Sequence, residues 1–425
     1  MTQAPAPAQG LPAYFAVTSA YWAFMLTDGA LRMLILLDFH AMGFSPVQLA
    51  YLFVLYEIAG MATNLSAGWI AARFGLTSTL YAGLSLQIVA LLALTQLDPN
   101  WQIATTVVFV MLVQGLSGVA KDLAKMSSKS AVKLLAPSTG DGLFRWVAVL
   151  TGSKNAIKGM GFLLGAGLLA SFGFMTAVLG MALILGLILF SLIIAMPPGL
   201  PRGRKGAKFS EVFSESRNVN WLSAARVFLF GARDIWFVVG IPIYFYAVFS
   251  DGTEEGNRAA FFLIGSFMAI WTILYGIVQA SAPRILKAAS RSEVQLIGSA
   301  RTWALLLMAV PAALALALLV SDGPAPWLTM TLIAGLLVFG AIFAVNSSLH
   351  SYLILAFTKA ERVTMDVGFY YMANAAGRLM GTVLSGLTYQ LGGLTACLGT
   401  AATMVALSAL AAGQLQDKTP KGPVI

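Results

Sequence analysis

The chain has 425 residues, of which 59% are hydrophobic and 10% are charged, and its formal net charge is +9. Its mean hydropathy of +0.83 excludes a soluble globular domain, in which about a quarter of the residues are charged. The positive charge is poor evidence for nucleic-acid binding, because it gathers between hydrophobic runs, where membrane proteins carry cytoplasmic Lys and Arg. The composition therefore predicts an all-α polytopic membrane protein.

Hydrophobic runs long enough to cross a bilayer recur along the whole chain. A helix needs about 20 apolar residues to cross the hydrocarbon core. The stretch Thr2–Gly10 has no basic residue, so we expect no secretory signal peptide and keep the first run as a span. Twelve spans are predicted, near residues 12–37, 45–71, 78–97, 102–125, 143–170, 174–196, 220–249, 259–282, 297–320, 327–356, 364–390 and 393–413.

The basic residues between the spans predict the orientation. If the N-terminus is cytoplasmic, the outer loops hold Arg258 as their one basic residue, beside Asp251, Glu254 and Glu255. The other Lys and Arg between spans then lie on the inner side, as the positive-inside rule requires. Both termini are therefore predicted to be cytoplasmic.

The spans divide into two halves. Pro, Gly and basic residues interrupt the hydrophobic pattern at 197–219, which is typical of a cytoplasmic linker. We predict an N-terminal six-helix bundle at 1–196, this linker, and a C-terminal six-helix bundle at 220–425. Repeated halves of this kind place a substrate site between them, near the bilayer midplane.

The halves also echo each other in sequence at an offset of 220 residues. Lys158 corresponds to Arg378, and Gly161 corresponds to Gly381. The same offset relates further small or acidic residues, namely Gly115 with Gly335, Ser127 and Ser128 with Ser347 and Ser348, Asp141 with Glu361, and Gly173 with Gly393.

Basic side chains at membrane depth indicate an anion site. At about 1.5 Å per residue, the fifth span carries Lys154 to a depth of about 17 Å and Lys158 to about 23 Å. Four residues apart, they share one helix face. Arg378, at the equivalent place in the other half, could bind an oxyanion such as phosphate through the planar fork of its guanidinium. The alternative is that each base balances an acid, such as Asp234 or Glu57, for structure alone.

Buried acids are the candidates for proton coupling and gating. Glu57 fits best, because no basic residue lies within four positions of it; a contact with Asn64 or the backbone is the alternative. Asp28 lies four residues before Arg32, so a local ion pair is the simplest account of both, with a gating role as the alternative.

The seventh span places Arg233 beside Asp234. Adjacent residues project about 100° apart on a helix, so we expect these two to have separate partners. Arg233 is a further candidate for the anion site, and Asp234 follows Glu57 and Asp28 as a proton carrier.

Lys121, Lys125, Lys129 and Lys133 form a stripe along the inner end of the fourth span, around Asp122. The stripe could attract an anion to the inner mouth or reach anionic lipid headgroups. In the tenth span, His350 is more typical of a hydrogen-bonded core residue than of a proton carrier. Cys397 is the one cysteine in the chain, which argues against a site of several thiolates.

The segment Gly68–Gly75 after the second span resembles the G-x-L-x-D-R-x-G-R-R loop of the major facilitator superfamily. Gly68, Arg73 and Gly75 match, whereas Ala72 and Leu76 depart from the pattern. The resemblance implies the twelve-helix, two-bundle fold of that superfamily. A tight inner turn with a positive-inside arginine explains the same residues.

A closer resemblance covers nearly the whole chain. Tyr21–Met33, Gly118–Ser127 and Phe144–Gly159 are similar to segments of the ArsJ organoarsenical efflux permeases. That resemblance implies arsenate resistance by export of 1-arseno-3-phosphoglycerate across a bacterial inner membrane. It also implies glyceraldehyde-3-phosphate dehydrogenase as a functional partner, which makes this ester from arsenate.

Transport by alternating access is the function that these features predict. No G-x-x-x-x-G-K-[ST] loop is present in the sequence, so we expect no ATP drive unless a separate chain brings it. We also expect no enzyme activity, cofactor or metal. A proton-driven exporter of another phosphorylated metabolite or of an amphipathic drug, and a non-transporting receptor or scaffold, are the alternatives. The predicted substrate-binding residues are Lys154, Lys158, Arg378, Arg233, Arg32, Lys121, Lys125 and Asn155, and the predicted coupling or gating residues are Glu57, Asp28, Asp234 and Asp122.

Overall fold

The computed structural model describes residues 7–135, 142–196, 214–287, 292–321, 323–358 and 363–416, and their regular structure is helical. The predicted linker falls largely at 197–213, outside the described residues. The helices are α1 (Pro7–Ala41), α2 (Pro46–Tyr51), α3 (Val54–Phe74), α4 (Leu76–Leu94), α5 (Ile103–Leu135), α6 (Gly142–Ala195), α7 (Arg217–Ile235), the π-helix η1 (Trp236–Gly240), α8 (Ile241–Phe249), α9 (Glu254–Ile285), α10 (Glu293–Leu319), α11 (Pro326–Phe357) and α12 (Val363–Ala412).

In the described ranges, ten helical segments are long and apolar enough to cross a bilayer. Two of them, in α6 and α12, run for 43 and 47 residues, which at about 1.5 Å per residue is about twice the hydrocarbon thickness. Each bends at glycine with positive φ, at Gly173 (φ 74°) and at Gly393 (φ 61°). These bends fall where the sequence predicts the end of one span and the start of the next.

The turn between α3 and α4 is shorter than the superfamily loop implies. Helix α3 continues to Phe74, so Gly68 and Arg73 are helical, and only Gly75 lies between the two helices. Gly75 has a φ of 76°, which a residue with a Cβ adopts at a cost. The expectation of a loop from Gly68 was wrong, because a single glycine in this conformation is enough to reverse the chain.

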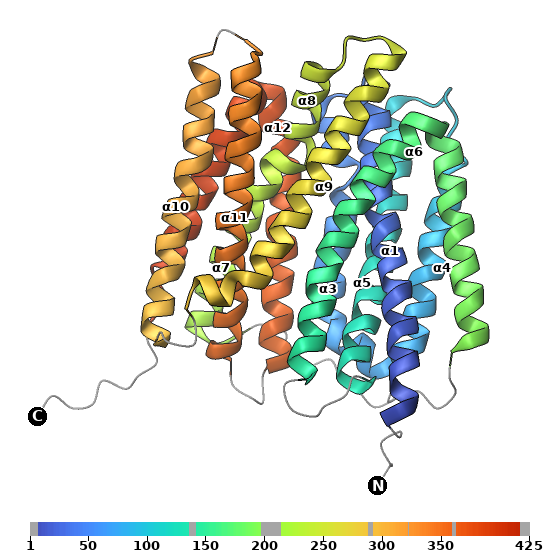
Figure 1. Cartoon of the computed structure of the whole chain (residues 1–425), viewed down its shortest axis with the longest axis vertical. Coiled ribbons are helices and arrows are strands. Elements are labelled where there is room, and N and C mark those ends of the chain that lie inside the picture. Colours follow the sequence, from blue (N-terminus) through green and yellow to red (C-terminus); the bar gives the residue numbers. More distant parts are fainter. Residues whose placement is uncertain are drawn as a thin grey trace, which may run out of the picture.

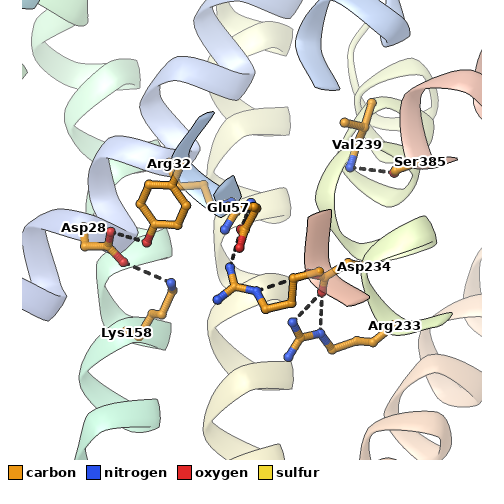
Figure 2. Close-up of polar contacts among 10 residues, drawn as sticks. Asp28, Arg32, Glu57, Lys158, Arg233, Asp234, Val239 and Ser385 are labelled. Carbon is orange, nitrogen blue, oxygen red and sulfur yellow. Dashed lines mark hydrogen bonds and ion pairs between the residues drawn. The ribbon is translucent and has the colours of Figure 1, made fainter. Parts of the chain in front are cut away.

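The predicted seventh span contains a π-helix. Pro242, near the start of α8, has no N–H to donate to the preceding turn. The Ser385 hydroxyl oxygen accepts hydrogen bonds from the N–H groups of Val239 (3.1 Å) and Gly240 (3.3 Å), which holds η1 against α12. Figure 2 shows the first of these bonds. Single turns of π-helix are common at functional sites.

Two close helix crossings depend on glycine. A Cβ at Gly29 of α1 would lie 2.7 Å from the Lys158 carbonyl oxygen of α6. A Cβ at Gly381 of α12 would lie 2.6 Å from the Gly231 carbonyl oxygen of α7. The first and fifth spans of each predicted half therefore cross in the same way.

In Figure 1, α1 and α3–α6 lie on one side of the molecule, and α7 and α10–α12 lie on the other. Helix α9 packs against α6, and α12 packs against α3, so these four helices join the two sides. The charged side chains described next lie on or beside these joining helices.

Candidate functional site

Acidic and basic side chains meet in the interior, although their helices are otherwise apolar. A charge at membrane depth is costly unless it has a partner or faces water. Ion pairs connect α1, α3, α12 and α7 in series, and a further ion pair joins α1 to α6; we refer to both together as the network, part of which Figure 2 shows.

Asp28 of α1 joins three helices. Its Oδ2 accepts a hydrogen bond from Lys158 Nζ of α6 at 3.0 Å, and its Oδ1 accepts one from the Tyr56 hydroxyl of α3 at 2.6 Å. The Asp28 side chain is 2% exposed, whereas that of Lys158 is 17% exposed. The ammonium group is therefore the more accessible member of the pair.

Glu57 of α3 accepts from two arginines through one oxygen. Arg378 Nη2 of α12 lies 2.5 Å from Glu57 Oε1, and Arg32 Nη2 of α1 lies 3.4 Å from the same atom. The second oxygen, Oε2, is buried and has no hydrogen-bond partner among the described residues. The bond between Glu57 and Arg378 links α3 to α12, and hence the two sides of the molecule.

Asp234 of α7 also has two arginine partners. Arg233 Nε donates to its Oδ1 at 2.6 Å, and Arg378 Nε approaches its Oδ2 at 3.4 Å. The Arg233 guanidinium also faces the Phe230 ring at 4.9 Å. Arg378 therefore bridges Asp234 and Glu57, two acids on opposite sides of the molecule.

Two predictions about these pairs were wrong. Arg233 and Asp234 do pair with each other, because the long arginine side chain reaches back across the 100° between adjacent positions. Asp28 and Arg32 do not pair locally: Asp28 binds Lys158, and Arg32 binds Glu57. In a packed bundle, a charged side chain can also reach partners on facing helices, so spacing along one helix does not determine which residues pair.

A second group of charges on α5 lies beside this network. Asp122 accepts from the Thr63 hydroxyl at 2.6 Å and from Lys125 Nζ at 3.2 Å. Lys125 Nζ also donates to Asn64 Oδ1 at 2.7 Å, so Asn64 is a partner of this lysine and was wrongly considered for Glu57. The partners of Glu57 are therefore two arginines, and neither Asn64 nor a backbone group, which were the alternatives considered from the sequence.

Lys121 connects the two groups. Its ammonium lies 4.0 Å from the centre of the Tyr56 ring, and it forms no ion pair with any described side chain. The Tyr56 hydroxyl donates a hydrogen bond to Asp28, and the Arg32 guanidinium lies 5.5 Å from the centre of the same ring. Tyr56 is therefore central to the site, although it was not among the predicted site residues. Its position next to Glu57 in the sequence is the feature from which it could have been predicted.

The remaining predicted residues lie at different places. Asn155 of α6 donates to Gln279 Oε1 of α9 at 3.0 Å, which is a second polar bond between the two sides. Lys154 is half-buried on α6, one turn before Lys158. Arg73 is exposed at the end of α3, away from the buried pairs. The side chains of Lys129 and Lys133 fall outside the described residues.

Positive charge exceeds negative charge in the described network. Six bases and four acids take part, which leaves an excess of two positive charges among these described residues. The bases are Arg32, Lys121, Lys125, Lys158, Arg233 and Arg378, and the acids are Asp28, Glu57, Asp122 and Asp234.

His350 and Cys397 are both buried. His350 was expected to be hydrogen-bonded, but neither of its ring nitrogens has a partner among the described residues. The Cys397 thiol lies 3.6 Å from the Ser385 carbonyl oxygen, within a packed apolar region. No group of three metal-ligating side chains occurs in the described parts of the chain.

Comparison with solved structures gives clear matches in fold. A crystal structure of a POT family transporter in complex with 5-aminolevulinic acid is 14% identical, with a TM-score of 0.70 over 94% of this chain and 95% of that chain. A structure of a proton-dependent oligopeptide transporter is 11% identical, with a TM-score of 0.68 over 95% and 98% of the two chains. A mutant of the nucleoside transporter NupG is 15% identical, with a TM-score of 0.68 over 94% and 98%.

No family model matches the sequence, and no curated protein matches it. The identities to the solved structures are low, so the likeness shows the fold alone. The chain is a multi-pass membrane protein with the fold of these membrane transporters.

Proposed function

We propose that the chain is a secondary active exporter of an organic anion that carries at least two negative charges. The observation that supports this most strongly is the excess of bases over acids around the bond between Glu57 and Arg378. A metabolite with two negative charges would neutralise that excess, and charge-assisted hydrogen bonds would replace part of its hydration.

The proposal includes the major facilitator arrangement of twelve spans in two bundles, 1–196 and 220–425, joined by the linker 197–219. The matching glycine crossings of α1 with α6 and α7 with α12 support it, as do the bends that divide α6 and α12. We place both termini on the cytoplasmic side on the charge of the loops, and the protein in a bacterial inner membrane on the resemblance to the ArsJ permeases.

Alternating access then depends on the polar bonds between the bundles. Glu57 bonds Arg378, and Asn155 bonds Gln279, each across the two sides. A substrate phosphate or arsenate competes with the Glu57 carboxylate for the Arg378 guanidinium, because both are oxyanions. Protonation of Glu57 weakens its hold on Arg378, so the proton and the anion act on the same bond.

We propose 1-arseno-3-phosphoglycerate as the exported anion, on the resemblance of three segments to the ArsJ permeases. Its two acidic groups could divide between Arg378 and the pair Lys158 and Lys121, one on each side of Glu57. Glyceraldehyde-3-phosphate dehydrogenase would supply this ester from arsenate and act as a functional partner.

Transport by everted vesicles tests the proposal. Vesicles that contain the protein should accumulate the arsenic ester when a proton gradient is imposed, and should not accumulate free arsenate or arsenite. Uptake of 3-phosphoglycerate in its place would favour another phosphorylated metabolite as the substrate. Accumulation of none of these anions would contradict export of a phosphorylated anion and favour the drug-exporter or scaffold alternatives.

A further inference from the structure

A second buried polar group lies outside the network, among α7, α11 and α12. Arg226 of α7 is 4% exposed. Its Nε donates to Asn374 Oδ1 of α12 at 2.9 Å, and its Nη1 donates to the carbonyl oxygen and the hydroxyl of Ser347 on α11, at 2.9 and 3.0 Å. The guanidinium also lies 4.0 Å from the Phe230 ring centre.

The Arg226 charge has no counter-ion among the described side chains. All three of its hydrogen-bond acceptors are neutral, and its Nη2 donates to none of the described residues. By contrast, Arg32, Lys158 and Arg378 each meet a carboxylate. A buried charge without an opposite charge strongly destabilises a folded protein, so an anion bound at Arg226 would stabilise the fold.

Further unpaired polar atoms occur on α11 beside this arginine. Asn346 and His350 are both 0% exposed. Neither amide atom of Asn346 and neither ring nitrogen of His350 has a hydrogen-bond partner among the described residues. The two are one turn apart on the same helix face, and they flank Ser347, which accepts from Arg226. Buried polar side chains usually have partners, so this concentration points to an unseen ligand.

We propose that Arg226, Asn346 and His350 bind one small monovalent anion with the chemistry of chloride. One guanidinium balances one negative charge, whereas a phosphate would leave an excess negative charge in this buried place. The Arg226 Nη2, the Asn346 amide and a ring N–H of His350 are donors without acceptors, which is the set that a halide requires. The anion neutralises Arg226 and fastens α7 to α11.

This site is separate from the proposed transport site. Arg226 precedes Arg233 by seven residues, about 10 Å along α7. Its hydrogen-bond partners are on α11 and α12, and none of them belongs to the network around Glu57, although Arg226 and Arg233 both contact the Phe230 ring. The proposal therefore does not depend on which substrate the protein transports.

Thermal unfolding of the purified full chain gives the first test. We expect chloride to raise the Tm by about 2 °C or more over gluconate at equal ionic strength, in a saturable manner, because chloride binds only the folded state. Arg226→Gln and Asn346→Ala should each lose this chloride dependence. Arg258→Gln is the matched control, since Arg258 is exposed and pairs with Glu254 at the surface, so this variant should retain it.

Bromide locates the site directly in the wild-type protein, which covers the case in which Arg226→Gln does not fold. Crystals grown in bromide should show an anomalous peak beside Arg226 and Asn346. A Tm that is equal in chloride and gluconate would overturn the proposal. Bromide peaks found only elsewhere, with water at the position beside Arg226 and Asn346, would also overturn it.

Discussion

Replacement of Arg378 by alanine should weaken binding of the substrate by about tenfold to a hundredfold. A guanidinium that grips an oxyanion with two charge-assisted hydrogen bonds gains about 3–6 kcal/mol. It must first give up its 2.5 Å bond to Glu57, a charge-assisted bond of about 1.5–3 kcal/mol. The remaining 1.5–3 kcal/mol, approximately, corresponds to that loss of affinity.

The protein should still fold without Arg378. Glu57 keeps Arg32 at 3.4 Å, and Asp234 keeps Arg233, so neither acid is left alone in the interior. Arg378→Lys keeps the charge but not the planar fork, and a partial loss of affinity is expected. Arg258→Ala, at an exposed pair with Glu254, should leave affinity unchanged and serves as the control.

Equilibrium binding of the radiolabelled ester to purified, monodisperse protein measures this effect. If Arg378 only balances the two acids for structure, Arg378→Ala lowers the Tm while the folded fraction binds the ester with wild-type affinity. That result would refute the reasoning about the site. A loss of affinity with little change in Tm supports it.

Three further predictions follow from the same structure. Glu57→Gln should bind the ester at least as well as the wild type but no longer accumulate it in response to a pH gradient; wild-type accumulation in vesicles would contradict this. Cys397→Ser should leave transport of the ester unchanged, since the thiol is packed against Ser385, and a loss of activity would point to a thiol-dependent cargo. Gly381→Ala should cost about 1–3 kcal/mol of stability by overpacking, whereas Gly399→Ala, which has no neighbour within 4 Å, should not; equal Tm values would refute the close crossing.

Hydrophobic length and glycine were enough to predict much of the fold from the sequence. The bends at Gly173 and Gly393 divide α6 and α12 at the predicted ends of spans. Length alone could not reveal the π-helix at Trp236–Gly240, because it depends on a contact with Ser385 of α12. Periodicity in the sequence predicts which residues are neighbours along one helix, but not which residues of another helix they contact.

The charged residues show the same limit. Composition identified the basic and acidic side chains, but i to i+4 spacing assigned Asp28 to Arg32, and the adjacent positions of Arg233 and Asp234 argued against their pair. Pairing in the interior depends on which side chains face each other across helices. Tyr56 was missed for this reason, since its hydroxyl and ring have partners on two other helices, α1 and α5.

The two proposed halves differ at one pair of corresponding residues. Lys158 and Arg378 correspond at the offset of 220, and each binds an acid on the first helix of its own half, Asp28 or Asp234. Arg378 alone of the two also binds an acid of the opposite half, Glu57. A relative movement of the halves can therefore leave the two internal pairs intact and break the Glu57 bond. Protonation of Glu57 and binding of an anion to Arg378 would each break this one bond, and its asymmetry would couple the two events.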